Sequence, residues 1–182
     1  MVLILISGTS GSGKSTIIKW LLKNIKDISL SISHTTRLPR ENELNGRDYH
    51  FISKGNFLKM IEGGKFYEWA EYDHNFYGTA FDELNKTKIV ILDVEREGSL
   101  KFKEFKTCKI FLKNTKEVIT ERLLKRYNND LEKVKKRIKY FEKDQENANS
   151  GIFDHIIITD NFDSNCKEIY KIIENFIKKS TI

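Results

Sequence analysis

Apolar residues along the chain fall into short continuous runs, separated by longer stretches in which apolar and charged residues recur at helical spacing. The run at 2–6 (VLILI) is continuous and five residues long, which predicts a buried strand. Further strands are expected at 28–33, 88–93, 108–112 and 155–159. Helices are expected over 17–22, over 116–147 with a break at 127–130, and from the turn at 160–163 to about residue 179.

Residues 45–79 follow a different pattern of short alternating stretches. Strands are expected at 49–52, 66–72 and 75–79, around one helix at 56–61 that ends at Gly63-Gly64. This pattern predicts a small inserted subdomain. Most of its aromatic rings are expected in the core, and a tyrosine hydroxyl that points into a cleft is the minority case.

A glycine-rich stretch lies between the first strand and the first helix. Its residues Gly8, Gly13, Lys14 and Ser15 meet the spacing G-x-x-x-x-G-K-[ST] of a phosphate-binding loop. Glycines let successive amide N–H groups turn inward, and the following helix directs its positive dipole end to the same point. Lys14 is then expected to reach the transferred phosphate, and the Ser15 hydroxyl to meet magnesium. The alternatives are a chance match and a loop that binds only sulfate-like anions.

A second polar group follows the strand at 28–33. Arg37 and Arg40 flank Pro39, and a Leu-Pro step disfavours helix, so both guanidinium groups are expected to converge on one anion from an extended or turning segment. The alternative is a solvated surface loop. Farther along, the run at 88–93 ends at Asp93, as expected where a parallel strand delivers an acid to the ligand edge of an α/β sheet.

Composition narrows the function classes. The 182 residues are 39% hydrophobic, enough for one core, and show no repeat or low-complexity segment. The net charge of +6 comes from lysines scattered among glutamates, so nucleic acid is not an expected partner. Small anionic ligands explain the excess of basic residues equally well. The short apolar start is a strand rather than a signal peptide or membrane span, which predicts a cytoplasmic protein without a membrane partner. Cys108, Cys166 and the four histidines show no metal-ligand spacing.

The chain resembles the guanylate kinases. The resemblance rests on GTSGSGKST (8–16), SISHTTRLPRENELNGRDYHF (31–51), KFYEWAEY (65–72), FYGTA (76–80) and ILDVEREG (91–98), and it runs from end to end. It implies an α/β fold: a P-loop parallel-sheet core flanked by helices, with a small mixed α+β GMP-binding subdomain and a helical lid. Residues 1–182 would form one domain, with its core at 1–32, 81–124 and 148–182, the subdomain at 33–80 and the lid at 125–147.

The implied activity is transfer of the γ-phosphoryl group of Mg-ATP to GMP, and to dGMP, giving ADP and GDP in purine nucleotide metabolism. Mg²⁺ would act with ATP as co-substrate, and the protein would be a monomer or weak dimer. The implied ATP-binding residues are Gly8, Ser10, Gly11, Ser12, Gly13, Lys14, Ser15 and Thr16, with Ser15 and Asp93 toward the metal. The implied catalytic residues are Lys14, Arg37, Arg126 and Arg137.

For GMP, the resemblance implies contacts to the phosphate from Arg37, Arg40, Tyr49 and Tyr77, and contacts to the guanine from Ser33, Glu68 and Thr79. Guanine shows two adjacent donors that one carboxylate can accept, and the hydroxyls of Ser33 and Thr79 would donate to O6. Glu95 is expected near the guanine or the loop lysine. Without the resemblance, Glu68 would be an ordinary carboxylate on a strand face.

Three stretches depart from the family pattern. Glu95 replaces the second aspartate of an Asp-x-Asp pair, and Glu97 replaces the glutamine of the Gln-Gly that follows the pair. Tyr127-Asn128 stands where Gly-Thr is frequent, and Thr159-Asp160 replaces Asn-Asp near the adenine. Arg126 and Arg137 are favoured over Arg122 as lid contacts to ATP, the alternative being charges on a solvated helix. Two other functions stay open: a kinase for another small phosphate ester, and a non-catalytic scaffold module that binds peptides.

Overall fold

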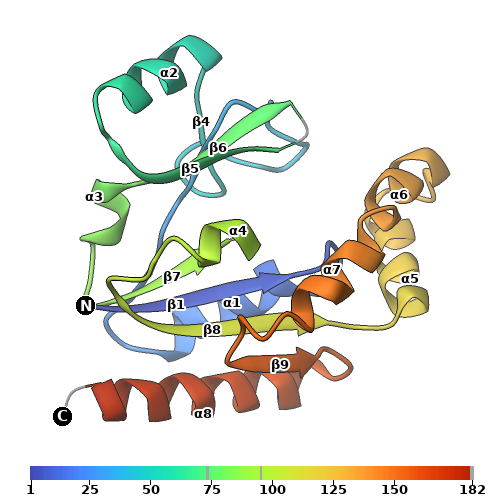
Figure 1. The fold of residues 1–182 in the computed structure, drawn as a ribbon. Helices are drawn as coiled ribbons and strands as arrows, with labels where there is room; N and C mark the ends of the chain where they lie inside the picture. Colours follow the sequence, from blue (N-terminus) through green and yellow to red (C-terminus); the bar gives the residue numbers. More distant parts are fainter. Residues whose placement is uncertain (73, 95, 181–182) are drawn as a thin grey trace. The chain divides into compact units, whose positions relative to one another are not determined.

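The computed structural model describes residues 1–72, 74–94 and 96–180 (Figure 1). The chain divides into two compact units: one comprises residue 1 and 27–92, and the other comprises 2–26 and 93–182. The larger sheet has the strand order β2-β7-β1-β8-β9, and the smaller sheet has the order β4-β3-β6-β5. Within the described part of the chain, no helix is both long and apolar enough to span a bilayer.

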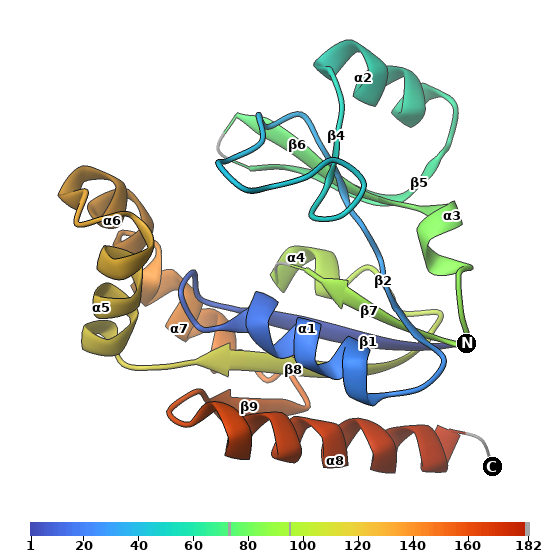
Figure 2. The ribbon, with the colours of Figure 1, turned by 180° about the vertical axis from the view of Figure 1, so that it is seen from behind.

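The second unit contains the strands β1 (Val2–Gly8), β8 (Lys106–Lys113) and β9 (His155–Ile158), which pair in parallel. Residues 3–6 are fully buried because the strand is apolar on both faces. The helices α1 (Lys14–Asn24) and α8 (Phe162–Ser180) pack against β1 and against each other, and Figure 2 shows α1 along the sheet. The other helices are α4 (Arg96–Ser99), α5 (Lys116–Arg126), α6 (Leu131–Ile138) and α7 (Phe141–Ala148).

The first unit contains the parallel pair β2 (Ile28–Leu30) and β7 (Ile89–Asp93) and the smaller sheet. The smaller sheet consists of β3 (His34–Thr35), β4 (His50–Phe51), β5 (Phe66–Tyr72) and β6 (Asn75–Ala80), accompanied by α2 (Lys54–Glu62) and α3 (Phe81–Leu84). Its core is aromatic, because Phe57 stacks on Phe66 at 4.4 Å and on Phe76 at 5.4 Å between ring centroids. An aromatic core is therefore present, but the expectation that most rings of 45–79 lie in it is wrong, because Trp69 is exposed and Tyr49, Phe51, Tyr67 and Tyr77 are only partly buried.

The predicted parallel-sheet core flanked by helices is confirmed, whereas the short elements α3, α4 and β3 were not predicted and several element ends differ. The strand expected at 28–33 stops at Leu30, and α2 begins at Lys54 because the Ser53 hydroxyl accepts the Asn56 N–H and caps the helix. The break at 127–130 is present, with Asn128 and Asn129 at positive φ. A second break, which the charge pattern did not predict, separates α6 from α7 at 139–140.

Candidate active site

The glycine-rich loop joins β1 to α1, and two glycines explain its path. A Cβ on Gly8 would lie 2.4 Å from the Leu112 carbonyl oxygen, so only glycine permits this close approach of β1 to β8. Gly13 is the N-cap of α1 at φ 89°, and no side chain caps the helix. The first amide groups of a helix lack intrahelical partners. The N-terminus of α1 is therefore open to an anionic ligand.

Two buried hydroxyls in this loop also indicate a ligand. Ser12 Oγ and Thr9 Oγ1 have no hydrogen-bond partner among the described residues, although these residues are 1% and 2% exposed. Buried polar groups are normally hydrogen-bonded. Ser12 lines a cavity of about 250 Å³, together with Gly13, Thr16, Ile17, Arg122, Thr159, Phe162 and Asn165. A phosphate-bearing ligand at the loop would give the Ser12 hydroxyl an acceptor.

Lys14 lies in the first turn of α1, and its Nζ is 2.6 Å from Asp93 Oδ1 at the end of β7. The two side chains are 16% and 34% exposed, so this ion pair lies at the margin of the site rather than in the core. Ser15, next in the chain, is an exposed residue. A hydroxyl and a carboxylate are oxygen ligands of the kind that Mg²⁺ prefers, so Ser15 and Asp93 fit the predicted metal contacts.

Arg122 of α5 lies at the loop, although the sequence favoured two other arginines. Its Nη1 donates to the Gly11 carbonyl at 3.4 Å and to Thr159 Oγ1 at 3.2 Å, and its Nη2 donates to the Thr159 carbonyl at 2.6 Å. Thr159 is 4% exposed, and Asn114 Nδ2 donates to the same carbonyl at 2.6 Å. Arg122 is thus held in place before any ligand arrives. The helix pattern gave no signal for Arg122, because its spacing of four residues from Arg126 puts both on one helix face.

The two favoured arginines lie farther along the chain, at the end of α5 and in α6. Arg126 is the exposed last residue of α5, with its guanidinium 5.7 Å from the Tyr127 ring centroid. Arg137 is a half-buried residue near the end of α6. Their contacts with ATP stay predictions.

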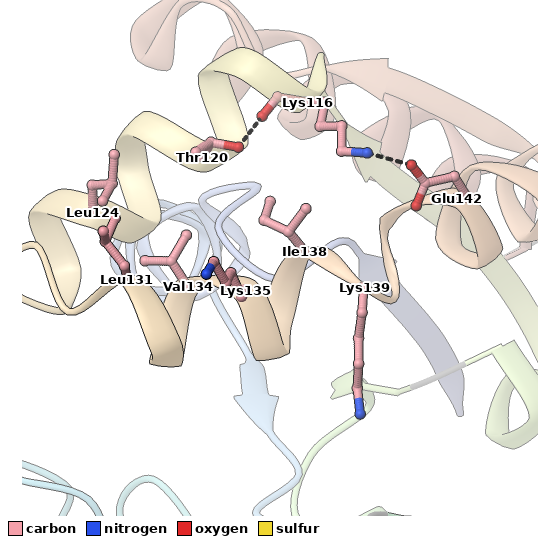
Figure 3. A pocket seen from close by; sticks show the side chains of 9 residues that line it. All are labelled: Lys116, Thr120, Leu124, Leu131, Val134, Lys135, Ile138, Lys139 and Glu142. Atoms are coloured by element: carbon pink, nitrogen blue, oxygen red, sulfur yellow. Dashed lines mark hydrogen bonds and ion pairs between the residues drawn. The ribbon is translucent and has the colours of Figure 1, made fainter.

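A cavity of about 400 Å³ lies between α5 and α6, and Figure 3 shows the side chains that line it. Its floor is apolar, formed by Leu124, Leu131, Val134 and Ile138, and the ion pair between Lys116 and Glu142 closes one end. None of the predicted site residues lines it. The groove therefore carries none of the residues predicted to bind phosphate.

In the other unit, Arg37 and Arg40 converge on the carboxylate of Glu43. Arg37 Nη2 donates to both Glu43 oxygens, at 2.9 and 3.1 Å. The Arg40 amide donates to Glu43 Oε2 at 2.8 Å, and Arg40 Nη1 lies 3.8 Å from Glu43 Oε1. The Arg37 side chain is only 14% exposed, so the interpretation as a solvated surface loop is wrong for Arg37. The sequence did not single out Glu43.

Arg37 also lies over two aromatic rings, with its guanidinium carbon 5.3 Å from the Tyr49 centroid and 5.6 Å from the Phe51 centroid. The Tyr49 ring meets the Tyr77 ring edge to face at 6.2 Å. The unit thus brings together three of the four predicted phosphate contacts, Arg37, Tyr49 and Tyr77, and places Arg40 beside them through Glu43. Planar guanidinium groups held in this way match the paired oxygens of a phosphate.

Glu68 and Thr79 face each other across the antiparallel pair of β5 and β6. Thr79 is 1% exposed, and its hydroxyl donates to Glu68 Oε1 at 2.7 Å. A hydroxyl has one proton to donate. In this structure the Thr79 hydroxyl donates that proton to Glu68 and so orients the carboxylate, instead of donating it to a nucleobase. Ser33, between β2 and β3, is half-buried, and its carbonyl accepts the His50 amide. Glu95 lies outside the described residues.

His34 of β3 has a strongly perturbed environment. Its ring stacks on the His50 ring at 4.5 Å and meets Phe66 edge on at 5.5 Å, and its Nδ1 is buried without a hydrogen-bond partner among the described residues. Burial is the largest cause that lowers the pKa of His34 to about 4, and electrostatic interactions with His50 and Lys86 lower it further against the opposing effect of Glu83. His34 is therefore neutral at pH 7.

Acidification is expected to destabilise the protein through His34. The unfolded chain takes up a proton at this imidazole below about pH 6.5, whereas the folded protein keeps it neutral until its pKa of about 4. The unfolded state thus binds more protons between these values, and stability falls as the pH falls. Because His34 is half-buried, screening limits the loss to roughly 1 kcal/mol.

Thermal unfolding between pH 7 and 4.5 would measure this effect in the wild type and in His34→Phe. The variant should lose less stability on acidification than the wild type. His155→Phe, at an exposed position on β9, is the control and should follow the wild type. An equal acid response in the His34 variant would contradict the assignment.

Comparison with known proteins identifies relatives over nearly the whole chain. A family model described as guanylate kinase matches residues 1–176. A guanylate kinase of Helicobacter hepaticus is 38% identical, covering 98% of this chain and 92% of that protein. One from Prochlorococcus marinus is 39% identical, covering 95% of this chain and 97% of that protein. A crystal structure of guanylate kinase from Anaplasma phagocytophilum matches with a TM-score of 0.69 at 27% identity, covering 96% of this chain and 85% of that one.

Proposed function

The chain belongs to the guanylate kinase family, and on this premise we propose that it transfers the γ-phosphoryl group of Mg-ATP to GMP, and to dGMP, giving ADP and GDP. One observation carries the proposal beyond family membership: Thr79 holds the Glu68 carboxylate by a hydrogen bond of 2.7 Å. An oriented carboxylate accepts the adjacent N1–H and amino groups of guanine, whereas adenine presents an acceptor at the first of these positions.

The donor half of the site, which binds ATP as the phosphoryl donor, is proposed at the glycine-rich loop. Residues 8, 10–13 and 14–16 would surround the ATP phosphates. Lys14 neutralises charge on the transferred phosphoryl group, and Ser15 and Asp93 hold Mg²⁺, which supplies further charge neutralisation when bound. Arg122 joins them, since it is held at the loop by Gly11 and Thr159. Arg126 and Arg137 are proposed to reach the phosphates from the lid at 125–147.

The acceptor half is proposed in the subdomain at 33–80, with Arg37, Arg40, Tyr49 and Tyr77 on the phosphate of GMP. Glu43 keeps both arginines in place, so little side-chain entropy is lost when the phosphate binds. A GMP phosphate oxygen is the nucleophile, and it needs little help from a base because its second pKa is about 6. Positioning and charge neutralisation therefore supply most of the catalysis.

Ser33 and Glu95 complete the proposed guanine contacts, and the core at 1–32, 81–124 and 148–182 carries the donor half. We further propose that the protein acts in purine nucleotide metabolism in the cytoplasm, as a monomer or weak dimer without nucleic-acid or membrane partners. The alternative of a non-catalytic scaffold module is less favoured, because the phosphate-binding loop motif is complete with Gly8, Gly13, Lys14 and Ser15.

The proposal is tested by ADP formation from Mg-ATP with GMP, AMP, CMP and UMP offered separately. We expect formation that depends on GMP, with a preference over AMP on the order of 10⁴ in kcat/KM. Equal rates without any acceptor would indicate a simple ATPase. Transfer to AMP, CMP or UMP at a rate comparable to that with GMP, or transfer to none of the four, would refute the proposal.

A further inference from the structure

The GMP-binding half contains a buried carboxylate that no proposed role yet uses. Glu83 of α3 is 6% exposed, and its two oxygens accept three hydrogen bonds. Oε2 accepts the Ile32 amide and Lys86 Nζ, both at 2.6 Å, and Oε1 faces His50 Nε2 at 3.0 Å. One side chain therefore joins the segment after β2, the first residue of β4 and the segment after α3.

The partners of Glu83 adjoin residues of the proposed GMP site. Ile32 directly precedes Ser33, and His50 directly follows Tyr49. Neighbouring Cα atoms are about 3.8 Å apart, so fixing one residue restricts where its neighbour can lie. The two segments are also joined directly, since the His50 amide donates to the Ser33 carbonyl at 2.9 Å. Glu83 thus restricts the positions of both Ser33, a proposed guanine contact, and Tyr49, a proposed phosphate contact.

The His50 ring is held on its face as well as at its tip. His34 and His50 are paired across β3 and β4, and their rings stack at 4.5 Å with an interplanar angle of 31°. His34 is in turn packed edge on against Phe66. With Nε2 on Glu83 and one face on His34, the His50 side chain has little freedom to turn, and Tyr49 is restricted with it.

The carboxylate of Glu83 is charged at neutral pH. Burial by itself would raise its pKa, but the hydrogen bonds from Lys86, Ile32 and His50 outweigh burial and hold the pKa below its usual value. Hydrogen bonds to an ionised acceptor are roughly twice as strong as those between neutral groups. A charged Glu83 therefore holds its three partners more firmly than a neutral side chain of the same size.

We propose that Glu83 is a positioning residue for GMP: through Ile32 and His50 it fixes Ser33 and Tyr49 in the arrangement that binds the nucleotide. The inference rests on the proposed function, because Ser33 and Tyr49 are GMP contacts only within it. Glu83 itself touches no substrate, so its replacement acts on acceptor binding and leaves the donor half intact.

Glu83→Gln tests the inference, because the amide keeps the size and replaces one acceptor oxygen with a donor that faces other donors. We expect the KM for GMP, and its Kd by calorimetry, to rise about tenfold, with kcat and the KM for ATP within about twofold of the wild type. Asp82→Asn is the matched control, since it removes a charge at the neighbouring exposed position of α3 and should leave all three constants unchanged.

His50→Phe is a second variant, which keeps an aromatic ring against His34 and removes only the bond to Glu83. This variant should raise the KM for GMP about threefold. If the Glu83 variant does not fold, the His50 variant tests the positioning role of Glu83 by itself. An unchanged KM for GMP in the folded variants, or equal changes in the KM values for GMP and ATP, would overturn the inference. Neither result would contradict the proposed GMP kinase activity. A wild type that neither binds nor phosphorylates GMP would overturn the proposed function and the inference together.

Discussion

Replacing Lys14 with alanine is expected to lower kcat by on the order of 10³-fold or more, as for other cations that contact a transferring phosphoryl group. Lys14 projects from the first turn of α1, where the helix dipole already favours anions, and it is paired with Asp93 at 2.6 Å. Removing the ammonium group deletes the positive charge and also leaves the Asp93 carboxylate unpaired near the phosphates. ATP binding should therefore weaken as well.

Steady-state kinetics with ATP and GMP would measure the loss, and Lys19→Ala is the matched control. Lys19 lies on the same helix, one turn and a half farther on, and is exposed. The control has the same change in net charge and should retain wild-type turnover. If Lys14→Ala turned over at the wild-type rate, the glycine-rich loop would not be the site of phosphoryl transfer.

Replacing Glu68 with glutamine is expected to relax the choice of base more than it reduces turnover. The amide places a donor where guanine also presents donors, and that donor can pair with the N1 acceptor of adenine. A site that recognises a base by such hydrogen bonds can discriminate by about 10⁴, and we expect the preference for GMP over AMP to fall to about 10² or less. Thr79 keeps its bond to the remaining carbonyl oxygen, so the side chain should stay in place.

The measurement is kcat/KM for GMP and AMP in the two proteins, with Glu71→Gln as the control. Glu71 lies on β5 like Glu68 but is exposed, so its replacement should leave base preference unchanged. An unaltered preference in the Glu68 variant would place guanine recognition elsewhere in the unit.

Much of the fold could be predicted from the sequence, because its signals are local. The run at 2–6 and the spacing of Gly8 and Gly13 determine a strand, a tight loop and a helix without help from distant residues. The helix ends were less predictable, since they depend on caps such as the Ser53 hydroxyl and on breaks such as that at 139–140.

The candidate site was predictable only in part. The loop residues and the pairing of Arg37 with Arg40 follow from short motifs, and family resemblance supplied Glu68. Arg122 was placed below Arg126 and Arg137 because charge patterns on a helix do not show which residue faces the loop. Its bond to Gly11 spans 111 positions of the chain.

The sequence by itself determined the phosphate-binding loop, the α/β pattern and the family, because each depends on residue types at fixed spacing. Only the tertiary structure decided that Glu43 holds the two arginines, that Thr79 orients Glu68, and that Glu83 binds a residue 51 positions away in the chain. The reason is physical: a buried carboxylate finds its donors through strand register and packing, which bring together segments that no local pattern relates.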